Sequence, residues 1–314
     1  MLRFALRRLL GAIPTLFIIV TLTFFMMRIA PGGPFDSARR LPPEVEANVK
    51  AAYNLDKPLL QQYGIYLGRL AHGDLGPSFK NKDFTVVQLI STGLPVSARL
   101  GLSAMALAVL IGTLLGSWAA LRQNRWQDYS VMGLAMTGIT IPTFVTAPLL
   151  TLVFGVYGVT LFGHEITLPV SGWNGGAWRN VILPVTVLAL PQIAIVSRLM
   201  RGSMIEVLRA NYIRTARAKG LPAHRILFGH ALRAAALPLV SYLGPATAGI
   251  LTGSLVVEQI FGLPGIGRYF VLAALDRDYT MVLGVVVVYA ALILVLNFVA
   301  DILYAVLDPR VRLS

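Results

Sequence analysis

The sequence contains no cysteine among its 314 residues and is poor in charged residues. Without cysteine the chain forms no disulfide and no thiolate metal site, so cysteine usage indicates no redox compartment. Charged residues make up only 13% of the chain, whereas a soluble domain has about a quarter. Apolar residues make up 56%, and the mean hydropathy is +0.71. These values argue against an ordinary soluble domain and favour a protein whose solvent is partly lipid.

Acidic residues are scarcer than basic ones, with 14 Asp and Glu against 27 Lys and Arg. The resulting net charge of +13 and isoelectric point near 10.4 are also typical of nucleic-acid-binding proteins. Here, however, the basic residues lie in short stretches between long uncharged runs, an arrangement typical of membrane proteins. We therefore expect membrane lipid, and no nucleic acid, as a partner.

Long uncharged runs are the strongest signal in the sequence. A bilayer core of about 30 Å needs about 20 apolar residues in a helix. Six runs approach or exceed this length: Leu9–Met27, Leu100–Leu121, Ser130–Tyr157, Asn180–Ser197, Ala234–Val257 and Tyr279–Ala300. We predict an all-α membrane protein with six transmembrane helices. Pro142 and Pro148 lie within the overlong third run, so we expect this span to be tilted or kinked.

The first run follows three arginines and could pass for a signal peptide. It is longer than the apolar region of such peptides, and Pro31-Gly32-Gly33-Pro34 follows it in place of a small-residue cleavage site. We interpret it as a retained span.

With the N-terminus inside, fifteen Lys and Arg residues lie on the cytoplasmic side, and the short outer loops hold only Arg179, Arg268 and Arg277. We therefore predict that both termini are cytoplasmic.

Three parts follow from this topology: an N-terminal tail and first transmembrane helix over residues 1–30, a periplasmic segment over residues 31–95, and a five-helix core over residues 96–314. The periplasmic segment has the periodicity of short helices. One is expected to start at Pro42-Pro43-Glu44, and another carries an apolar repeat at Leu59, Tyr63, Tyr66, Leu67 and Leu70. A floppy loop is the alternative.

The loop between the fourth and fifth spans, at about residues 202–233, is rich in arginine. Its stretch IEVLRANYIRTARAKG ends at Gly220, and Pro222 follows, so we predict one helix over Ile205–Gly220 and a second after the turn. In the first helix, one apolar arc comprises Ile205, Leu208, Tyr212 and Ala216. A basic, imperfectly amphipathic helix could lie on anionic lipid. Alternatively, it could be the docking surface for a cytoplasmic partner.

Motifs for several chemistries are missing. The chain has no GxxxxGK[ST] phosphate loop, so it holds no ATP site of that kind, and His164-Glu165 lacks the second histidine of a zinc protease. We expect no catalytic residue, no metal site and no cofactor in this chain. The six apolar runs contain no ionisable residue for a proton relay. Glu258 and Asp301 lie at span ends, where we interpret Glu258 as an interfacial carboxylate that could fix the turn at residues 261–265, with a substrate contact as the alternative.

Several segments together resemble one family over almost the whole chain. The loop sequence YIRTARAKGL is typical of bacterial ABC importer permeases of the oligopeptide, dipeptide and nickel branch. RIAPGGP after the first span, YNLDKPLLQQYGIYLGRLAHGDLGPSF in the outer segment, VVEQIFGLPGIGRYF near the last span and DILYAVLDPRVR at the C-terminus resemble the same branch. AMTGITIP and RGSMIEVL are similar to the B-type membrane subunits of oligopeptide permeases.

This resemblance implies a type I ABC importer permease fold in the bacterial inner membrane. It implies that the 205–220 loop inserts into a groove on the ATPase subunit and couples it to the spans. The residues expected to take part are Glu206, Tyr212, Arg214, Thr215, Ala216, Arg217, Ala218, Lys219 and Gly220. It also implies a second homologous permease subunit, two cytoplasmic ATPase subunits that bind ATP and Mg, and a periplasmic or lipid-anchored peptide-binding protein.

Other interpretations remain. The substrate could be dipeptides, nickel or another solute of the same branch, and no substrate-binding residue can be named. A stand-alone channel or secondary carrier is the alternative of another class, although the spans lack ionisable residues. An intramembrane protease would need a catalytic pair that the spans do not contain.

The pairs Gly112 with Gly116 and Gly249 with Gly253 permit close helix packing, either within the chain or at a subunit seam.

Overall fold

The fold is a bundle of long helices. The computed structural model describes residues 2–29, 51, 53–81, 83–161 and 164–307. Within these residues five helices are long and apolar enough to cross a membrane, or up to six if one bent pair counts as a span. They are α1 (Leu2–Ile29), α4 (Val86–Leu121), the bent pair α5 (Trp126–Thr140) and α6 (Thr143–Thr151), α7 (Trp178–Leu208), α10 (Leu237–Gly253) with its extension α11 (Leu255–Ile260), and α13 (Tyr279–Leu307). The predicted helical membrane fold is confirmed.

Helix α4 begins well before the apolar run that predicts it. Thr85 caps its start: the Thr85 hydroxyl accepts from the Gln88 N–H, and the Gln88 side chain accepts from the Thr85 N–H. The helix then continues for 36 residues, about 54 Å at 1.5 Å per residue. Pro95 lies inside it, so the boundary expected between residues 95 and 96 falls within a helix.

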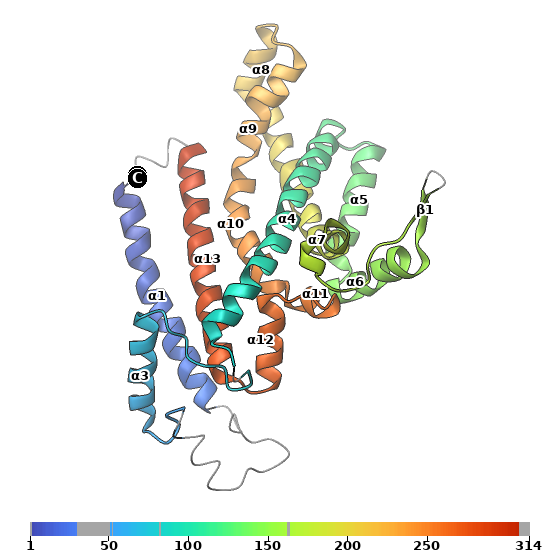
Figure 1. The fold of residues 1–314 in the computed structure, drawn as a ribbon. Helices are drawn as coiled ribbons and strands as arrows, with labels where there is room; N and C mark the ends of the chain where they lie inside the picture. Colours follow the sequence, from blue (N-terminus) through green and yellow to red (C-terminus); the bar gives the residue numbers. More distant parts are fainter. Residues whose placement is uncertain (1, 30–50, 52, 82, 162–163, 308–314) are drawn as a thin grey trace.

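Helices α4 and α7 form the centre of the bundle (Figure 1). Two glycines on α4 allow this close approach. A Cβ on Gly112 would lie 2.7 Å from the Val196 Cβ, and one on Gly116 would lie 2.8 Å from the Met200 Cβ. The first glycine pair therefore packs within this chain. Gly249 on α10 is different, because a Cβ there would meet no atom within 4 Å.

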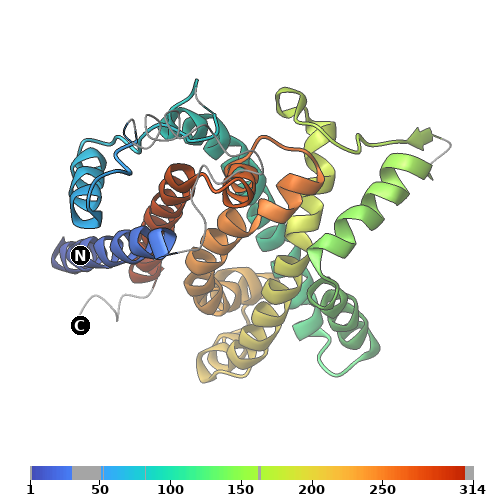
Figure 2. The same cartoon turned by 90° about the horizontal axis from the view of Figure 1, so that it is seen from below.

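Helix α1 packs against α13, and α3 (Leu59–Ala71) lies beside α1 at the edge of the bundle (Figure 2). Helices α1 and α3 are joined by a 2.6 Å hydrogen bond between the hydroxyls of Thr21 and Tyr63, and by stacking of Phe24 on Tyr66 at 5.5 Å. Helix α3 matches the predicted apolar repeat from Leu59 to Leu70. The helix start predicted at residues 42–44 lies outside the described residues, as does the end of the C-terminal segment DILYAVLDPRVR.

The third span is broken rather than gently kinked. Helices α5 and α6 meet at an angle of 102°. Ile141 adopts an extended conformation between them because it precedes Pro142, and a residue before proline avoids the helical region. A π-helical turn, η1 (Leu152–Tyr157), and an antiparallel hairpin of β1 (Val159–Leu161) and β2 (His164–Ile166) follow. No pattern in the sequence predicts this hairpin.

The remaining elements are short and lie at the two ends of the bundle. The helical turn η2 (Asn174–Gly176) precedes α7, and α8 (Asn211–Ala218), η3 (Arg225–Ala231) and α9 (Leu232–Ala235) connect α7 to α10. Helix α12 (Ile266–Leu275) precedes α13. In Figure 1 the start of α1 and the end of α13 lie toward the end of the molecule that carries α8, and α3 lies at the opposite end. We refer to these as the α8 end and the α3 end.

Candidate functional site

The arginine-rich loop folds as a short helix on top of the bundle (Figure 1). Helix α7 ends at Leu208, and Ala210, with φ −66° and ψ 148°, breaks the chain before α8 begins at Asn211. The single helix predicted from Ile205 to Gly220 is therefore wrong. The break rotates the two halves relative to each other, so the predicted apolar arc does not form. Tyr212 is 49% exposed, and Ile213 takes the buried position instead.

Two buried side chains attach α8 to the rest of the chain. Ile213 is fully buried and Ala216 nearly so, and both belong to a cluster that includes Met204 of α7, Ile226 of η3 and Ala231. Because apolar contact is the main stabilising term here, α8 is held as part of the α7–α9 unit rather than as a free loop.

The end of α8 depends on Gly220. Its φ of +74° lies in the left-handed region, and the Gly220 N–H bonds the Arg217 carbonyl at 2.9 Å. The next N–H, of Leu221, bonds the Ala216 carbonyl at 3.2 Å. These two bonds make a Schellman motif, in which glycine is favoured because it has no Cβ. A Cβ on Gly220 would meet no atom within 4 Å, so the requirement comes from the backbone alone.

Most of the residues predicted for docking lie on the outer surface of this unit. Eight of the nine are exposed: Glu206, Tyr212, Arg214, Thr215, Arg217, Ala218, Lys219 and Gly220. The ninth, Ala216, is buried against the cluster. The exposed side of α8 is thus basic and carries one large aromatic ring. Such a surface can bind a partner with an acidic or aromatic groove.

Polar contacts connect this unit to the neighbouring spans. The Arg201 guanidinium of α7 makes two hydrogen bonds to the Asp128 carboxylate of α5, from Nε at 2.5 Å and from Nη2 at 2.6 Å. The Asp128 side chain is only 1% exposed, and it also accepts from the Asn124 N–H. Arg209, at the end of α7, donates to Gln123 at 3.0 Å. The end of α7 that leads into α8 is therefore bonded to α5 and to the loop that follows α4.

A second polar site surrounds Glu258, which the sequence analysis interpreted as an interfacial carboxylate. Its side chain is fully buried. Glu258 Oε1 accepts from the hydroxyls of Ser97 at 2.6 Å and Ser254 at 2.7 Å, and Oε2 accepts from the Arg268 N–H at 3.1 Å. The Ser97 oxygen also accepts from the Ile266 N–H. We call these five residues the Glu258 cluster; they join α4, α11 and the start of α12.

Glycines make room for this carboxylate. A Cβ on Gly265 would overlap the Glu258 side chain, and one on Gly267 would lie 2.6 Å from the Leu255 Cα. The turn at residues 261–265 and the first residues of α12 therefore wrap the carboxylate, which agrees with the predicted role of Glu258 in fixing this turn. Burial of the side chain was not predicted, because one acidic residue at a span end gives no sign of partners 161 residues away.

The other sequence candidates lie apart from these sites. Asp301 pairs with Arg8, with Nε and Oδ2 3.1 Å apart, on the side of the bundle formed by α1 and α13. Across the described residues, no three side chains among His, Asp and Glu come together as a metal site.

Comparison with known proteins agrees with the fold. The family described as Binding-protein-dependent transport system inner membrane component matches residues 112–313. A second family, described as Binding-prot-dependent transport system membrane comp, N-term, matches residues 1–101. Together these two matches cover nearly all of the chain.

Individual relatives match over their full length. The oligopeptide transport system permease protein OppB of Salmonella typhimurium is 57% identical over 312 residues, covering 99% of this chain and 100% of that protein. The dipeptide transport system permease protein DppB of Bacillus subtilis is 42% identical over 313 residues, covering 100% of this chain and 99% of that protein. A crystal structure of an amino acid ABC transporter covers 71% of this chain and 94% of that chain, with 18% identity and a TM-score of 0.49.

Proposed function

Because this chain belongs to the family of binding-protein-dependent transport system inner membrane components, we propose that it forms part of the passage through which an ABC importer moves oligopeptides. The chain itself is a non-catalytic, multi-pass subunit of the inner membrane, and such an importer works with ATPase subunits and a substrate-binding protein. A stand-alone secondary carrier is thereby excluded.

The assignment of oligopeptides as the substrate rests on sequence identity, which is higher to an oligopeptide permease than to a dipeptide permease. Identity is 57% to an oligopeptide permease and 42% to a dipeptide permease, each over essentially the whole chain. Dipeptides are accordingly the second candidate substrate. Nickel, which other permeases of the same branch transport, is the third.

We place the α8 end in the cytoplasm. This orientation puts the arginines of α8 and the loop between α4 and α5 on the side that membrane proteins enrich in Lys and Arg. It puts α3 on the outer side, where the substrate-binding protein arrives. Both chain ends then lie inside, as the sequence analysis expected.

The exposed side of α8 serves as the docking surface for an ATPase subunit, with Tyr212, Arg214 and Arg217 as its largest side chains. Two such subunits, which bind ATP and Mg, and a second homologous permease complete the proposed assembly. Movement of a docked ATPase subunit is passed to α7 through the buried contacts of Ile213, and to α5 through the pair of Arg201 and Asp128. The spans then move as a unit because close packing transmits displacement.

Reconstitution tests this function. The complete transporter is placed in liposomes with ATP on the α8 side, and uptake of labelled tripeptides to pentapeptides, dipeptides and nickel is compared. We expect uptake of the longer peptides, dependent on both ATP and the substrate-binding protein. Uptake of dipeptides or nickel alone would replace the substrate assignment, and ATP hydrolysis by this purified chain without partners would refute its assignment as a non-catalytic subunit.

A further inference from the structure

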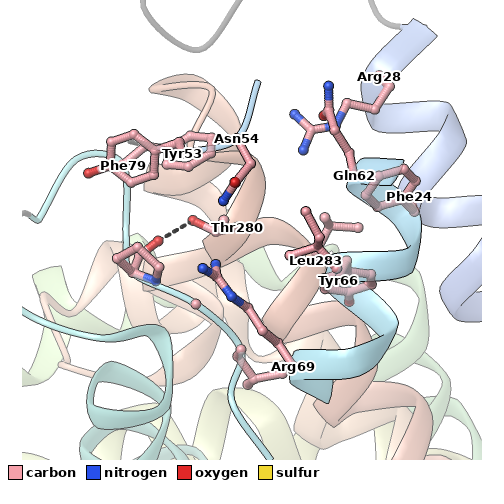
Figure 3. Close-up of a pocket in the computed structure, with 14 residues that line it drawn as sticks. Phe24, Arg28, Tyr53, Asn54, Gln62, Tyr66, Arg69, Phe79, Thr280 and Leu283 are labelled. Atoms are coloured by element: carbon pink, nitrogen blue, oxygen red, sulfur yellow. Dashed lines mark hydrogen bonds between the residues drawn. The ribbon is translucent and has the colours of Figure 1, made fainter. Parts of the chain in front are cut away.

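A small pocket of about 50 Å³ lies at the α3 end, between α1, α3, the loop at residues 75–79 and the start of α13. Figure 3 shows Arg28 of α1 and Arg69 of α3 entering it from different sides, with Tyr53 and Phe79 across from Arg28. The two aromatic rings pack edge to face, 4.6 Å between centroids, and form an apolar wall. The pocket thus combines two guanidinium groups with an aromatic lining.

Among the residues that the structure describes, the cationic groups of this pocket lack a strong anionic partner. The Arg28 guanidinium lies over the rings of Phe24 at 5.2 Å and Tyr279 at 5.6 Å, and its buried Nε has no hydrogen-bond partner among the described residues. Arg69 has one distant ion pair, with its Nε 4.0 Å from Asp74 Oδ2, and both side chains are largely exposed. Such a pair is weak in water. A guanidinium that is partly buried without an anion is unfavourable, so the pocket attracts one.

Tyr66 and Gln62 add neutral polar atoms. Burial raises the pKa of Tyr66 to about 12, so its hydroxyl stays protonated and can donate. That hydroxyl is buried and has no partner among the described residues. Gln62 directs its amide nitrogen to the carbonyls of Leu55 and Lys57, which leaves its oxygen as an acceptor. The site therefore offers several donors and one acceptor, a balance that suits a carboxylate ligand.

We propose that this pocket receives the carboxylate of an aspartate or glutamate side chain presented by the substrate-binding protein when it docks at the α3 end. The proposal rests on the function proposed above, which places that protein on this side. The volume suits one carboxylate rather than a whole peptide residue, and a single guanidinium can bind a carboxylate through two parallel N–H···O bonds in a fixed geometry. Arg28 and Arg69 lie on α1 and α3, to the side of the central α4–α7 packing, so we assign the pocket to docking and not to the passage.

Binding of the substrate-binding protein to the complete transporter tests this site. The transporter is held in nanodiscs, and its affinity for the peptide-loaded protein is measured by biolayer interferometry at low and high salt. The variants are R69Q, R28Q and R28K, with K57Q as a matched control that removes a cation at the same end outside the pocket. We expect R69Q and R28Q each to weaken binding about tenfold, R28K to recover part of the loss, and K57Q to change it less than about twofold.

A second measurement locates the partner's carboxylate. Each acidic residue of the substrate-binding protein is replaced by alanine, and one replacement is expected to show no additional loss when combined with R69Q, because the two changes remove the same contact. Additive losses at every acidic position would overturn the proposal.

The remaining outcomes are also decisive. Unchanged affinity in R28Q and R69Q overturns the proposal, whether or not a co-purified anionic lipid is lost from the variants. Weaker binding by R28Q alone, with a lower melting temperature, shows a packing role and overturns it as well. Peptide-dependent ATP hydrolysis by the unmodified transporter is recorded in parallel. If the unmodified transporter shows no peptide-dependent ATP hydrolysis, the proposed function is contradicted. If it does hydrolyse ATP, and both variants bind the substrate-binding protein with normal affinity, only the assignment of the pocket is contradicted.

Discussion

Around α8 the polar side chains lie in solvent and two apolar residues hold the helix, whereas around Glu258 a charged side chain lies inside and glycines surround it. Ile213 and Ala216 are the buried residues of α8. In the Glu258 cluster the fully buried carboxylate accepts from the hydroxyls of Ser97 and Ser254 and from the Arg268 N–H. The first arrangement leaves its polar groups available to another protein, and the second uses all of them internally. The contrast indicates that α8 is built for contact and the Glu258 cluster for holding helices together.

Removal of the carboxylate is expected to have the largest effect. Glu258→Ala leaves two hydroxyls and the Arg268 N–H without their acceptor, which should lower the free energy of unfolding by about 2 to 4 kcal/mol. The melting temperature of the purified complex measures this. Glu258→Gln should lose less, because its amide oxygen can still accept from Arg268 and its NH₂ can donate to a serine oxygen. If Glu258→Ala were as stable as the unmodified protein, the Glu258 cluster would not be what holds these helices together.

Adjacent residues of α8 provide a sharper test. Ile213→Ala removes a fully buried side chain and should destabilise the attachment of α8 by about 2 to 4 kcal/mol, seen as faster hydrogen exchange over residues 209–220. Tyr212→Ala removes an exposed ring, so exchange should remain normal while the ATPase subunit binds more weakly. If the two variants were alike in both measurements, the division between inner and outer faces would be wrong.

Gly220 tests the turn that ends α8. Gly220→Val forces a β-branched residue into the left-handed region, at a cost of about 1 to 2 kcal/mol or more. Peptide uptake per ATP hydrolysed should fall, while insertion in the membrane stays intact. Gly220→Asn is the matched control, because asparagine tolerates this conformation, and it should retain most of the coupling. Uptake by Gly220→Val at the unmodified rate would count against the docking role.

The smallest change concerns Ser97, whose hydroxyl bridges the Ile266 N–H and the Glu258 carboxylate. Ser97→Ala should cost about 1 to 2 kcal/mol, since Glu258 keeps its other two donors and only the Ile266 N–H loses its acceptor. Thermal unfolding beside Glu258→Ala measures the difference. A loss in Ser97→Ala as large as that in Glu258→Ala would mean that the contact from α4 accounts for the whole cluster.

The spans were predictable from the sequence because length and lack of charge suffice to identify a membrane helix. All six runs correspond to helices, although the third is broken into α5 and α6. The sharp bend after Thr140 was less predictable, since proline marks a break but not its angle, and the start of α4 at Val86 depends on a capping box outside the apolar run.

In α8 the sequence located the loop and its terminating glycine, yet it assigned the wrong residue to the buried face. The error arose from one residue, Ala210, whose extended conformation no propensity indicates. Burial of Glu258 depends on Ser97, far away in the sequence, so only tertiary structure reveals it. Local signals therefore predict where elements lie, and distant contacts decide which side chains face inward.

The docking of an ATPase subunit on α8 is tested most directly by cross-linking. The sequence has no cysteine, so Thr215→Cys introduces a single thiol on the exposed side of α8, and Leu60→Cys introduces one on α3 at the opposite end. A short bifunctional cross-linker is applied to the assembled transporter, and the products are identified by mass spectrometry. We predict that Thr215→Cys is joined to the ATPase subunit and Leu60→Cys is not. Cross-linking of the ATPase subunit from Leu60→Cys, or its absence from Thr215→Cys in an intact complex, would contradict the account.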